Sequence, residues 1–142
     1  MTESTPDFAE EAALAFLRGF WASDLDEAMR HAAPDASWVF ARSLPYEREM
    51  PAREAMQRIL DDMFESFDPE GFRIEHRACV SDGDTVMVEY SAHGKTRSGK
   101  PYDNDYVMSI SVADGKVTSV RPHTDTLHLV QLLMDEPQQE AG

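Results

Sequence analysis

The stretch that decides the fold is Tyr102-Asp-Asn-Asp-Tyr-Val-Met-Ser-Ile-Ser-Val112, followed by Asp114-Gly115 and by Val117-Thr-Ser-Val-Arg-Pro-His-Thr-Asp125. In its first part, aromatic, amide and apolar side chains alternate with mostly polar ones at a period of two, which is typical of a strand with one buried face. The Asp-Gly pair is a strong hairpin signal. The stretch therefore predicts two long antiparallel strands joined by a tight turn.

The residues before this hairpin extend the sheet. Residues 72–80 and 86–92 alternate in the same way and are joined by the tight connection Ser81-Asp-Gly-Asp84. Trp38-Val39-Phe40 has the aromatic and β-branched content of a further strand. The last four strands form an antiparallel meander, and strands of this length are able to curl around helices packed on one face.

Two helices are expected near the N-terminus. Thr5 and Pro6 indicate an N-cap and a first helical position, and an apolar stripe at helical spacing continues from there to Trp21. Ser23-Asp-Leu-Asp26 resembles a capping box and predicts a second, short helix that Pro34 stops.

A third helix is expected to open at Pro51 and to end in the turn residues Asp68-Pro-Glu-Gly71. Residues 127–134 predict one or two further helical turns after the last strand. The expected fold class is therefore α+β, with a strongly curved antiparallel sheet wrapped around three N-terminal helices.

Length and composition point to one globular domain. The chain has 142 residues, of which 42% are hydrophobic, so it is long enough to bury a core and still enclose a cavity. We expect a single domain over residues 1–142, with an ordered core from about residue 6 to residue 134 and loose ends on both sides.

The charge excludes several classes of partner. The formal net charge is −14, which repels nucleic-acid phosphates and anionic lipid headgroups. No basic region followed by an apolar run marks a secretory signal, and no apolar stretch is long enough for a membrane span. Cys79 is the one cysteine, so no intramolecular disulfide is possible. A cytoplasmic location is expected.

Several polar side chains fall on the same face of the predicted strands as the apolar residues that are expected to point inward. If Met108 faces inward, Asn104 and Tyr106 do so as well, and if Val117 faces inward, Arg121, His123 and Asp125 follow. Burying such groups without partners costs about 1–3 kcal/mol each. These groups therefore need either structural partners or a pocket that holds a ligand. Further residues are expected around this pocket: Phe16, Phe20 and Trp38 as its apolar wall, His76 from the parity of its strand, and Tyr90.

Each of these residues also has a structural interpretation. Asp125 is placed to cap the helix that follows it. His76 and His123 are equally compatible with hydrogen-bonded core histidines, and Asn104 with a partner on a sheet-edge backbone group. Arg121 fits an ion-paired position near a strand edge, and Trp38 fits plain core. His123, Asp125 and His128 have only a generic metal-ligand spacing, so no metal site is expected.

The chain resembles the SnoaL-like, or polyketide cyclase-like, family of the nuclear-transport-factor-2-like superfamily. The likeness runs from about Phe8 to Met134. The segments that carry it are Phe20-Trp-Ala-Ser-Asp-Leu25, Ala33-Pro-Asp-Ala-Ser-Trp38, Gly99-Lys-Pro-Tyr-Asp-Asn-Asp-Tyr106, Asp114-Gly-Lys-Val117 and Arg121-Pro-His-Thr-Asp125.

The resemblance implies a cone-shaped α+β barrel of the NTF2-like or cystatin-like kind, with a deep apolar pocket, no cofactor, no metal and a homodimer built through the outer sheet face. In SnoaL-like cyclases the carboxylate of the terminal motif is the acid/base, a role that maps onto Asp125, although Pro122 and His123 replace the family's Glu and Tyr. Steroid isomerases of this fold use a tyrosine on the first helix and an aspartate on the first strand, where this chain has aromatic residues only.

Two functions follow from these observations. The first is a cofactor-independent acid/base enzyme of the cyclase, isomerase or dehydratase type, acting on a small apolar carbonyl or polycyclic compound. In it, Asp125 abstracts a proton, His123 assists, and Asn104 and Tyr106 donate hydrogen bonds to the developing oxyanion. The second is a binding or dimerisation module with the same pocket and no chemistry. A protein-interaction adaptor that uses the outer sheet face is a third interpretation.

Overall fold

The structure is a computed structural model that describes residues 8–135, with side chains to residue 132. The expected Thr5-Pro6 helix start and both expected loose ends lie outside the described residues. The chain forms, in order, α1 (Phe8–Trp21), α2 (Leu25–Arg30), β1 (Ala32–Val39), β2 (Glu49–Pro51), α3 (Ala52–Ser66), β3 (Arg73–Asp82), β4 (Thr85–Lys95), β5 (Pro101–Ala113), β6 (Lys116–Thr124) and α4 (Thr126–Asp135).

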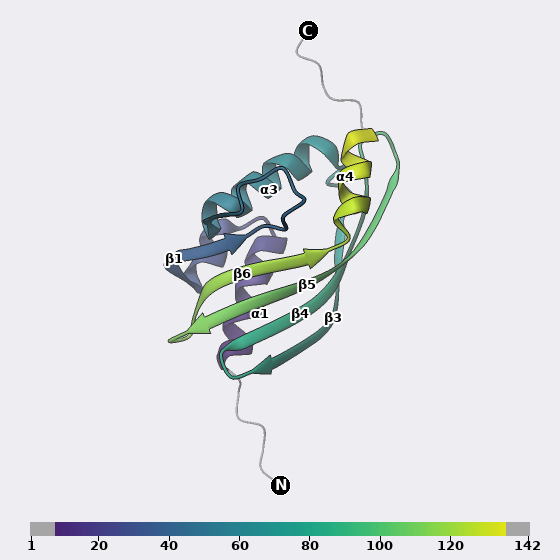
Figure 1. Cartoon of the computed structure of the whole chain (residues 1–142). Helices are drawn as coiled ribbons and strands as arrows, with labels where there is room; N and C mark the ends of the chain where they lie inside the picture. Colours follow the sequence, from purple (N-terminus) through teal and green to yellow (C-terminus); the bar gives the residue numbers. More distant parts are fainter. Residues whose placement is uncertain (1–7, 136–142) are drawn as a thin grey trace.

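The six strands form one curved sheet in the order β2-β1-β6-β5-β4-β3. Its neighbours pair antiparallel except for β1 and β6, which run parallel. Helices α1 and α3 lie on one face of the sheet, and α4 lies at the end where β6 finishes (Figure 1). The expected α+β fold class is confirmed. The sequence pattern missed the short strand β2 and the parallel pairing of β1, which begins at Ala32, where the second helix was expected to continue.

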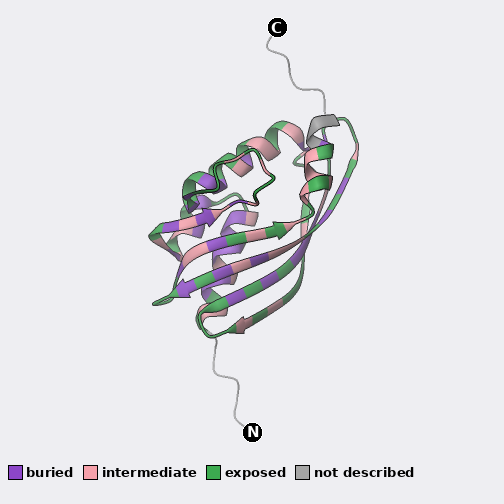
Figure 2. Cartoon of the chain, in the orientation of Figure 1, coloured by how far each residue is buried: buried purple, intermediate pink, exposed green. Residues whose placement is uncertain are grey.

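The core lies between α1 and the middle of the sheet. Ala13, Phe16 and Leu17 of α1 have no exposed surface. They pack in one cluster with strand residues that are also fully buried, and buried and exposed residues alternate along the strands (Figure 2). These strand residues are Val86, Val88, Ile110, Val117 and Val120. This half of the sheet is filled with side chains, so any cavity must lie toward the other end.

A β-bulge in β6 reverses the parity of its second half. Ser111 pairs with Ser119 and Val112 pairs with Val117, so Thr118 is an extra residue opposite that step of β5. The Thr118 hydroxyl donates a hydrogen bond to the Ser111 carbonyl oxygen at 3.2 Å. Because side chains alternate at a period of two, one extra residue exchanges the inner and outer faces for everything that follows.

A second bulge acts in the same way on β3. His76 pairs with Tyr90 and Ala78 with Glu89, which leaves Arg77 as the extra residue. The alternation of residues 72–80 places Ala78 and Val80 on the same inner face as His76, which is wrong: both are exposed, and Val80 is 62% exposed. Cys79, which the same alternation places on the outer face, is half-buried and packs against the core.

The outer face of β3, β4 and β5 carries a charged network centred on His93. Its Nδ1 lies 2.6 Å from Asp103 Oδ1, and its Nε2 lies 3.0 Å from Glu75 Oε1. These contacts, with Asp103 first, raise the pKa of His93, while His93 and then Arg77 lower the pKa of Glu75. The network therefore links three strands most strongly when His93 is charged and Glu75 is ionised.

We expect thermal stability to fall as the pH rises above neutrality. A raised folded-state pKa gives stabilisation that is complete below the ordinary histidine value of 6.5 and is lost as the pH rises through the folded value. The lowered pKa of Glu75 adds stabilisation that is present above the ordinary value of 4.5 and is lost in acid. The check is the melting temperature from pH 5 to 8.5, in which His93→Gln should flatten the alkaline decline. An unchanged profile in this variant would contradict the assignment.

No helix among the described residues is long and apolar enough to cross a membrane.

Candidate functional site

A cavity of about 280 Å³ lies between the sheet, the C-terminal end of α1 and the C-terminal half of α3. Its walls come from β1, β3, β4, β5 and β6, from the C-terminal end of α1, from the C-terminal half of α3 and the segment after it, from the loop between β1 and β2, and from α4. Most of the wall is aromatic or aliphatic. These apolar residues include Phe20, Trp21, Trp38, Phe40, Leu44, Leu60, Met63, Phe67, Phe72, Ile74, Met108 and Leu129. Its volume is near the lower end of the range of about 300–1,000 Å³ that is usual for ligand pockets.

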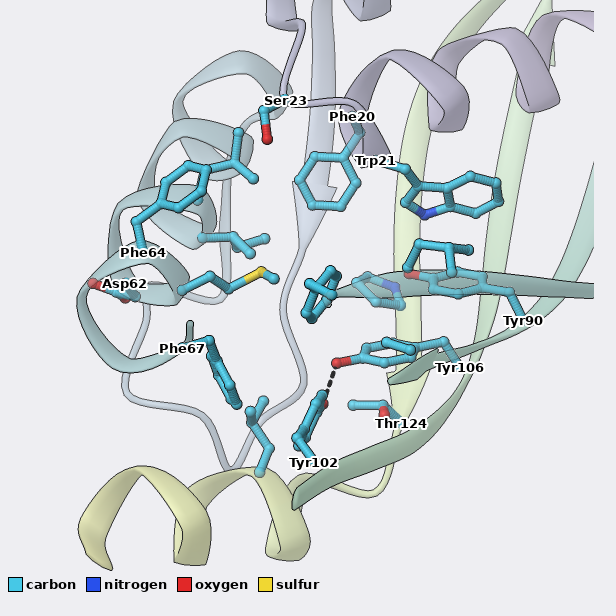
Figure 3. A pocket seen from close by; sticks show the side chains of 18 of the residues that line it. Phe20, Trp21, Ser23, Asp62, Phe64, Phe67, Tyr90, Tyr102, Tyr106 and Thr124 are labelled. Atoms are coloured by element: carbon cyan, nitrogen blue, oxygen red, sulfur yellow. Dashed lines mark hydrogen bonds between the residues drawn. The ribbon is translucent and has the colours of Figure 1, made fainter. Parts of the chain in front are cut away.

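Two tyrosine hydroxyls meet in this cavity. Tyr102 and Tyr106 are both on the inner face of β5, and their hydroxyl groups are hydrogen-bonded to each other (Figure 3). Behind them the Asn104 Nδ2 donates to the Tyr102 hydroxyl oxygen at 3.0 Å and to the Asp125 carbonyl oxygen at 3.1 Å. Asn104 is 5% exposed and accepts a bond from the Asp105 N–H on its own Oδ1. The amide therefore fixes both the Tyr102 hydroxyl and the start of α4.

The two phenol protons determine which hydrogen bonds the Tyr102 and Tyr106 hydroxyls can donate. Each phenol carries one proton, and only one of the two protons can lie between the two oxygens. Because the Tyr102 oxygen already accepts the amide N–H, Tyr102 is best placed to donate to Tyr106. The Tyr106 hydroxyl is also hydrogen-bonded to the Thr124 side chain, whose own proton goes to the Asp105 carbonyl oxygen at 2.8 Å, so a ligand oxygen in the cavity competes with Thr124 for the Tyr106 proton. Hydrogen bonds in such a chain polarise one another, which strengthens the terminal donor.

Tyr90 places a second phenol beside the first. It pairs with Tyr106 across β4 and β5, and the two rings stack with centroids 5.0 Å apart and planes 4° from parallel. Both side chains extend from the sheet into the cavity in the same direction (Figure 3). The Trp21 ring packs edge-on against Tyr90 at 4.8 Å. The hydroxyls of Tyr90 and Tyr106 therefore lie close together in an apolar surrounding.

Burial keeps these phenols protonated. It is the largest cause of the raised pKa values of Tyr90, Tyr102 and Tyr106. The ordinary tyrosine pKa is about 10, so all three stay neutral at physiological pH. Among the described side chains, no carboxylate or imidazole is hydrogen-bonded to any of the three hydroxyls. They are therefore donors of hydrogen bonds and not groups that exchange a proton near neutral pH.

A carboxylate lies in the cavity wall opposite the tyrosines. Asp62 of α3 accepts a hydrogen bond from the Tyr46 hydroxyl, which belongs to the loop between β1 and β2. Burial and then Asp62 raise the pKa of Tyr46, and the Arg58 guanidinium lies 5.8 Å from the centre of its ring. Asp62 and Phe64 stand across the cavity from the strands (Figure 3). This contact ties the loop to α3 at the wall of the cavity.

Five of the residues predicted from the sequence line the cavity. They are Phe20, Trp38, Tyr90, Tyr106 and Met108. Asn104 is in the second layer, where it holds Tyr102, and it contacts the Asp125 backbone as the structural interpretation allowed. The pairing of Asn104 and Tyr106 on one inner face of β5 is therefore confirmed.

The predicted placement of the other residues is wrong. Arg121, His123 and Asp125 are exposed on the outer side, because the bulge at Thr118 turns Pro122 and Thr124 inward instead. Asp125 caps α4: its Oδ1 accepts a hydrogen bond from the His128 N–H at 3.0 Å.

Two further residues lie away from the cavity. His76 is exposed beside the β3 bulge, where its Nε2 lies 3.3 Å from the Ala78 carbonyl oxygen. Phe16 is fully buried in the filled part of the core.

The sequence interpretation also missed wall residues. Tyr102 has the parity of Asn104 and Tyr106, so the alternation of β5 was sufficient to find it. Pro122 and Thr124 were hidden by a bulge that has no clear sequence signal. Tyr46 and Asp62 meet only in the tertiary structure, and neither stands out in its own segment. No group of three or more His, Cys, Asp or Glu side chains within the described part of the chain is arranged to hold a metal ion.

Comparison with known proteins agrees with this geometry. A family model described as a SnoaL-like domain matches residues 13–120. The chain belongs to the SnoaL-like family. Among solved structures, TerC co-crystallized with polyporic acid is similar to this SnoaL-like chain with a TM-score of 0.77 and 23% identity, over 91% of this chain and all of TerC (100%).

Two other solved structures are similar to the same extent. A candidate SnoaL-like polyketide cyclase from Jannaschia sp. CCS1 has a TM-score of 0.75 and 19% identity, over 96% of this chain and 100% of its own. An NTF2-like protein from Burkholderia thailandensis E264 has a TM-score of 0.75 and 21% identity, over 91% of this chain and 98% of its own. No curated protein sequence matches. At these identities the likeness shows the SnoaL-like fold, and function rests on the site itself.

Proposed function

We propose that this protein binds a small, flat, largely apolar molecule that carries a carbonyl or phenolic oxygen. Tyr106, with Tyr90 beside it, donates hydrogen bonds to that oxygen, and the aromatic wall encloses the apolar body. The observation that carries the proposal is the hydroxyl pair of Tyr102 and Tyr106, because it places polar hydrogen-bonding groups at one point of an otherwise apolar cavity.

The surroundings of the pair favour this function over the alternatives. A cavity of about 280 Å³ favours ligand binding over a pure adaptor, in which side chains fill this space. Protonated phenols suit a neutral acceptor or a delocalised oxyanion. The TerC protein, which shares the fold, was co-crystallized with polyporic acid, and this agrees with ligand binding by the present chain. The homodimer implied by the family remains a prediction.

Catalysis by the expected acid/base residues has no support, because Asp125 and His123 lie outside the cavity. Any proton abstraction next to a bound carbonyl requires a base in the wall, where the lining carboxylates are Asp62 and Asp68. Asp62 already accepts a hydrogen bond from the Tyr46 hydroxyl, and Asp68 accepts one from the Glu70 N–H at 2.9 Å. Binding without chemistry is therefore the function that the geometry supports best.

Replacing Tyr106 with phenylalanine should weaken binding of 1-tetralone, a bicyclic ketone, by about fivefold, since a net hydrogen bond contributes about 1 kcal/mol. Binding of tetralin, which has the same shape without the oxygen, should not change. Titration calorimetry measures both affinities, and Asp125→Ala is the control that should leave both unaltered. Equal losses for the two probes would contradict the proposal. Incubation of 1-tetralone in deuterated water adds a test of chemistry: deuterium exchange beside the carbonyl that Asp62→Asn abolishes would establish an enzyme instead.

A further inference from the structure

Tyr46 closes the cavity on the side of the loop between β1 and β2. Its ring lines the cavity and packs against the Phe40 ring, with 4.5 Å between the ring centres and 30° between the planes. Its hydroxyl donates a hydrogen bond to Asp62, and the Arg58 guanidinium lies 5.8 Å from the centre of the ring. Contacts with the end of β1 and with α3 therefore hold this ring in one orientation.

The loop that carries Tyr46 is itself tied to the rest of the fold. At its base the Phe40 N–H donates to the Arg48 carbonyl oxygen at 2.8 Å, and Arg48 Nη1 donates to the Phe40 carbonyl oxygen at 2.6 Å. Further along the loop, the Ser43 hydroxyl donates to the Thr126 hydroxyl oxygen at 3.1 Å, which joins the loop to the start of α4. Tyr46 is therefore part of a fixed wall.

The Tyr46 hydroxyl lies across the cavity from the Tyr106 hydroxyl. Its partner Asp62 stands on the α3 side, and the tyrosines of β5 stand on the strand side (Figure 3). A ligand whose oxygen accepts from Tyr106 therefore extends its apolar body away from the sheet, toward α3 and Tyr46. Tyr46 is half-buried, whereas the exposed residues of the wall mark the opening of the cavity elsewhere, at Ser23, Phe64 and Pro69.

We infer that Tyr46, held in place by Asp62, is the residue that sets the maximum length of the ligand. This inference rests on the proposed function and deepens it, because it adds a selection by length to the recognition of an oxygen. Each CH₂ group that fills free apolar space raises affinity by up to about fourfold. An atom forced against a fixed ring lowers affinity instead, by about fivefold or more. Affinity therefore rises with ligand length until the far end of the ligand reaches Tyr46, and then falls.

A series of ligands that differ only in length tests the inference. The probes are para-alkyl acetophenones from the methyl to the octyl compound, in which the carbonyl group and the growing chain lie at opposite ends of the ring. Tyr46→Ala removes the obstructing ring, Tyr46→Leu shortens it, and Tyr46→Phe keeps the ring but removes its hydrogen bond to Asp62. Ser43→Ala is the matched control, since it loosens the same loop at a residue that does not line the cavity. Titration calorimetry measures the affinities, and circular dichroism checks the fold of each variant.

In the wild-type protein, affinity should rise with chain length and then fall by about fivefold or more past a limiting length. Tyr46→Ala should move this limit outward by about two carbons or more, because the missing ring leaves apolar space, and should change the affinity of the methyl compound by less than about twofold. Tyr46→Leu should move the limit by less. Tyr46→Phe should keep the limit and reduce the loss beyond it, because the ring is then free to turn aside.

Ser43→Ala should leave the limit unchanged. The inference is overturned if the wild-type affinity keeps rising to the octyl compound, if the limit stays in place in both Tyr46→Ala and Tyr46→Leu, or if Ser43→Ala moves it as far as Tyr46→Ala does. A Tyr46→Phe profile identical to that of the wild type would overturn the role of Asp62. These outcomes leave Tyr106 as the oxygen donor. If the wild-type protein binds none of the ketones, or if Tyr106→Phe does not weaken the methyl compound, the proposed function itself fails.

Discussion

Replacing Asn104 with alanine is expected to lower the free energy of unfolding by about 3 kcal/mol and to weaken ligand binding as well. The side chain is almost fully buried, and its amide group joins the Tyr102 hydroxyl to the Asp125 carbonyl oxygen at the start of α4. Its loss leaves both oxygens without their donor in a region that water does not reach. The direction of the Tyr102–Tyr106 hydrogen bond is then no longer set, so Tyr106 becomes a weaker donor.

Urea denaturation measures the stability effect, and calorimetry with 1-tetralone measures the effect on binding. Ser111→Ala is the matched control, since Ser111 is an exposed residue on the same strand and should change stability by less than about 0.5 kcal/mol. Hydrogen exchange adds a local measurement: the α4 amides should exchange faster in Asn104→Ala. Normal stability together with normal ligand affinity would show that the amide does not organise the site.

The strands show how much of this fold a sequence pattern predicts. On β5, period-two alternation places Tyr102, Asn104, Tyr106 and Met108 on the inner face, and each lies there. That strand pairs with β4 along its whole length without a bulge. Parity therefore carries from one end of it to the other, and the predicted part of the candidate site is correct.

On β6 the same rule fails after one residue. Thr118 is a good strand former, and nothing in Val117-Thr-Ser-Val120 separates a regular strand from a bulged one. The bulge becomes visible only in pairing, where Val117 and Val120 are both buried at a spacing of three. This single insertion moved the expected acid/base pair, His123 and Asp125, to the outside. The local sequence pattern predicts the helices and strands well. The assignment of catalytic residues beyond a bulge depends instead on how the strands pair in the folded protein.

Replacing Gly19 with alanine is expected to destabilise the protein by about 2 kcal/mol or more, although the same change inside a helix normally stabilises by up to about 1 kcal/mol. A Cβ at this position would lie 2.6 Å from the Ala28 nitrogen and 2.8 Å from its Cα. Both obstructing atoms belong to the backbone of α2, so α1 and α2 must separate to make room. A loss of stability where this change normally gives a gain is the result that identifies the steric clash. Thermal or urea denaturation measures the change in the free energy of unfolding.

Gly94 provides the comparison that isolates the cause. A Cβ at Gly94 would lie 2.8 Å from Cδ2 of the Phe72 ring, an atom of a side chain that can rotate away. Gly94→Ala should therefore cost less stability than Gly19→Ala. It should, however, alter ligand affinity, because Phe72 lines the cavity. Trimming the obstructing side chain with Phe72→Leu should restore stability to Gly94→Ala, whereas Ala28→Gly should not rescue Gly19→Ala, since the obstructing backbone remains. Rescue by Ala28→Gly would show instead that the obstruction to the added Cβ is the Ala28 side chain and not the backbone of α2.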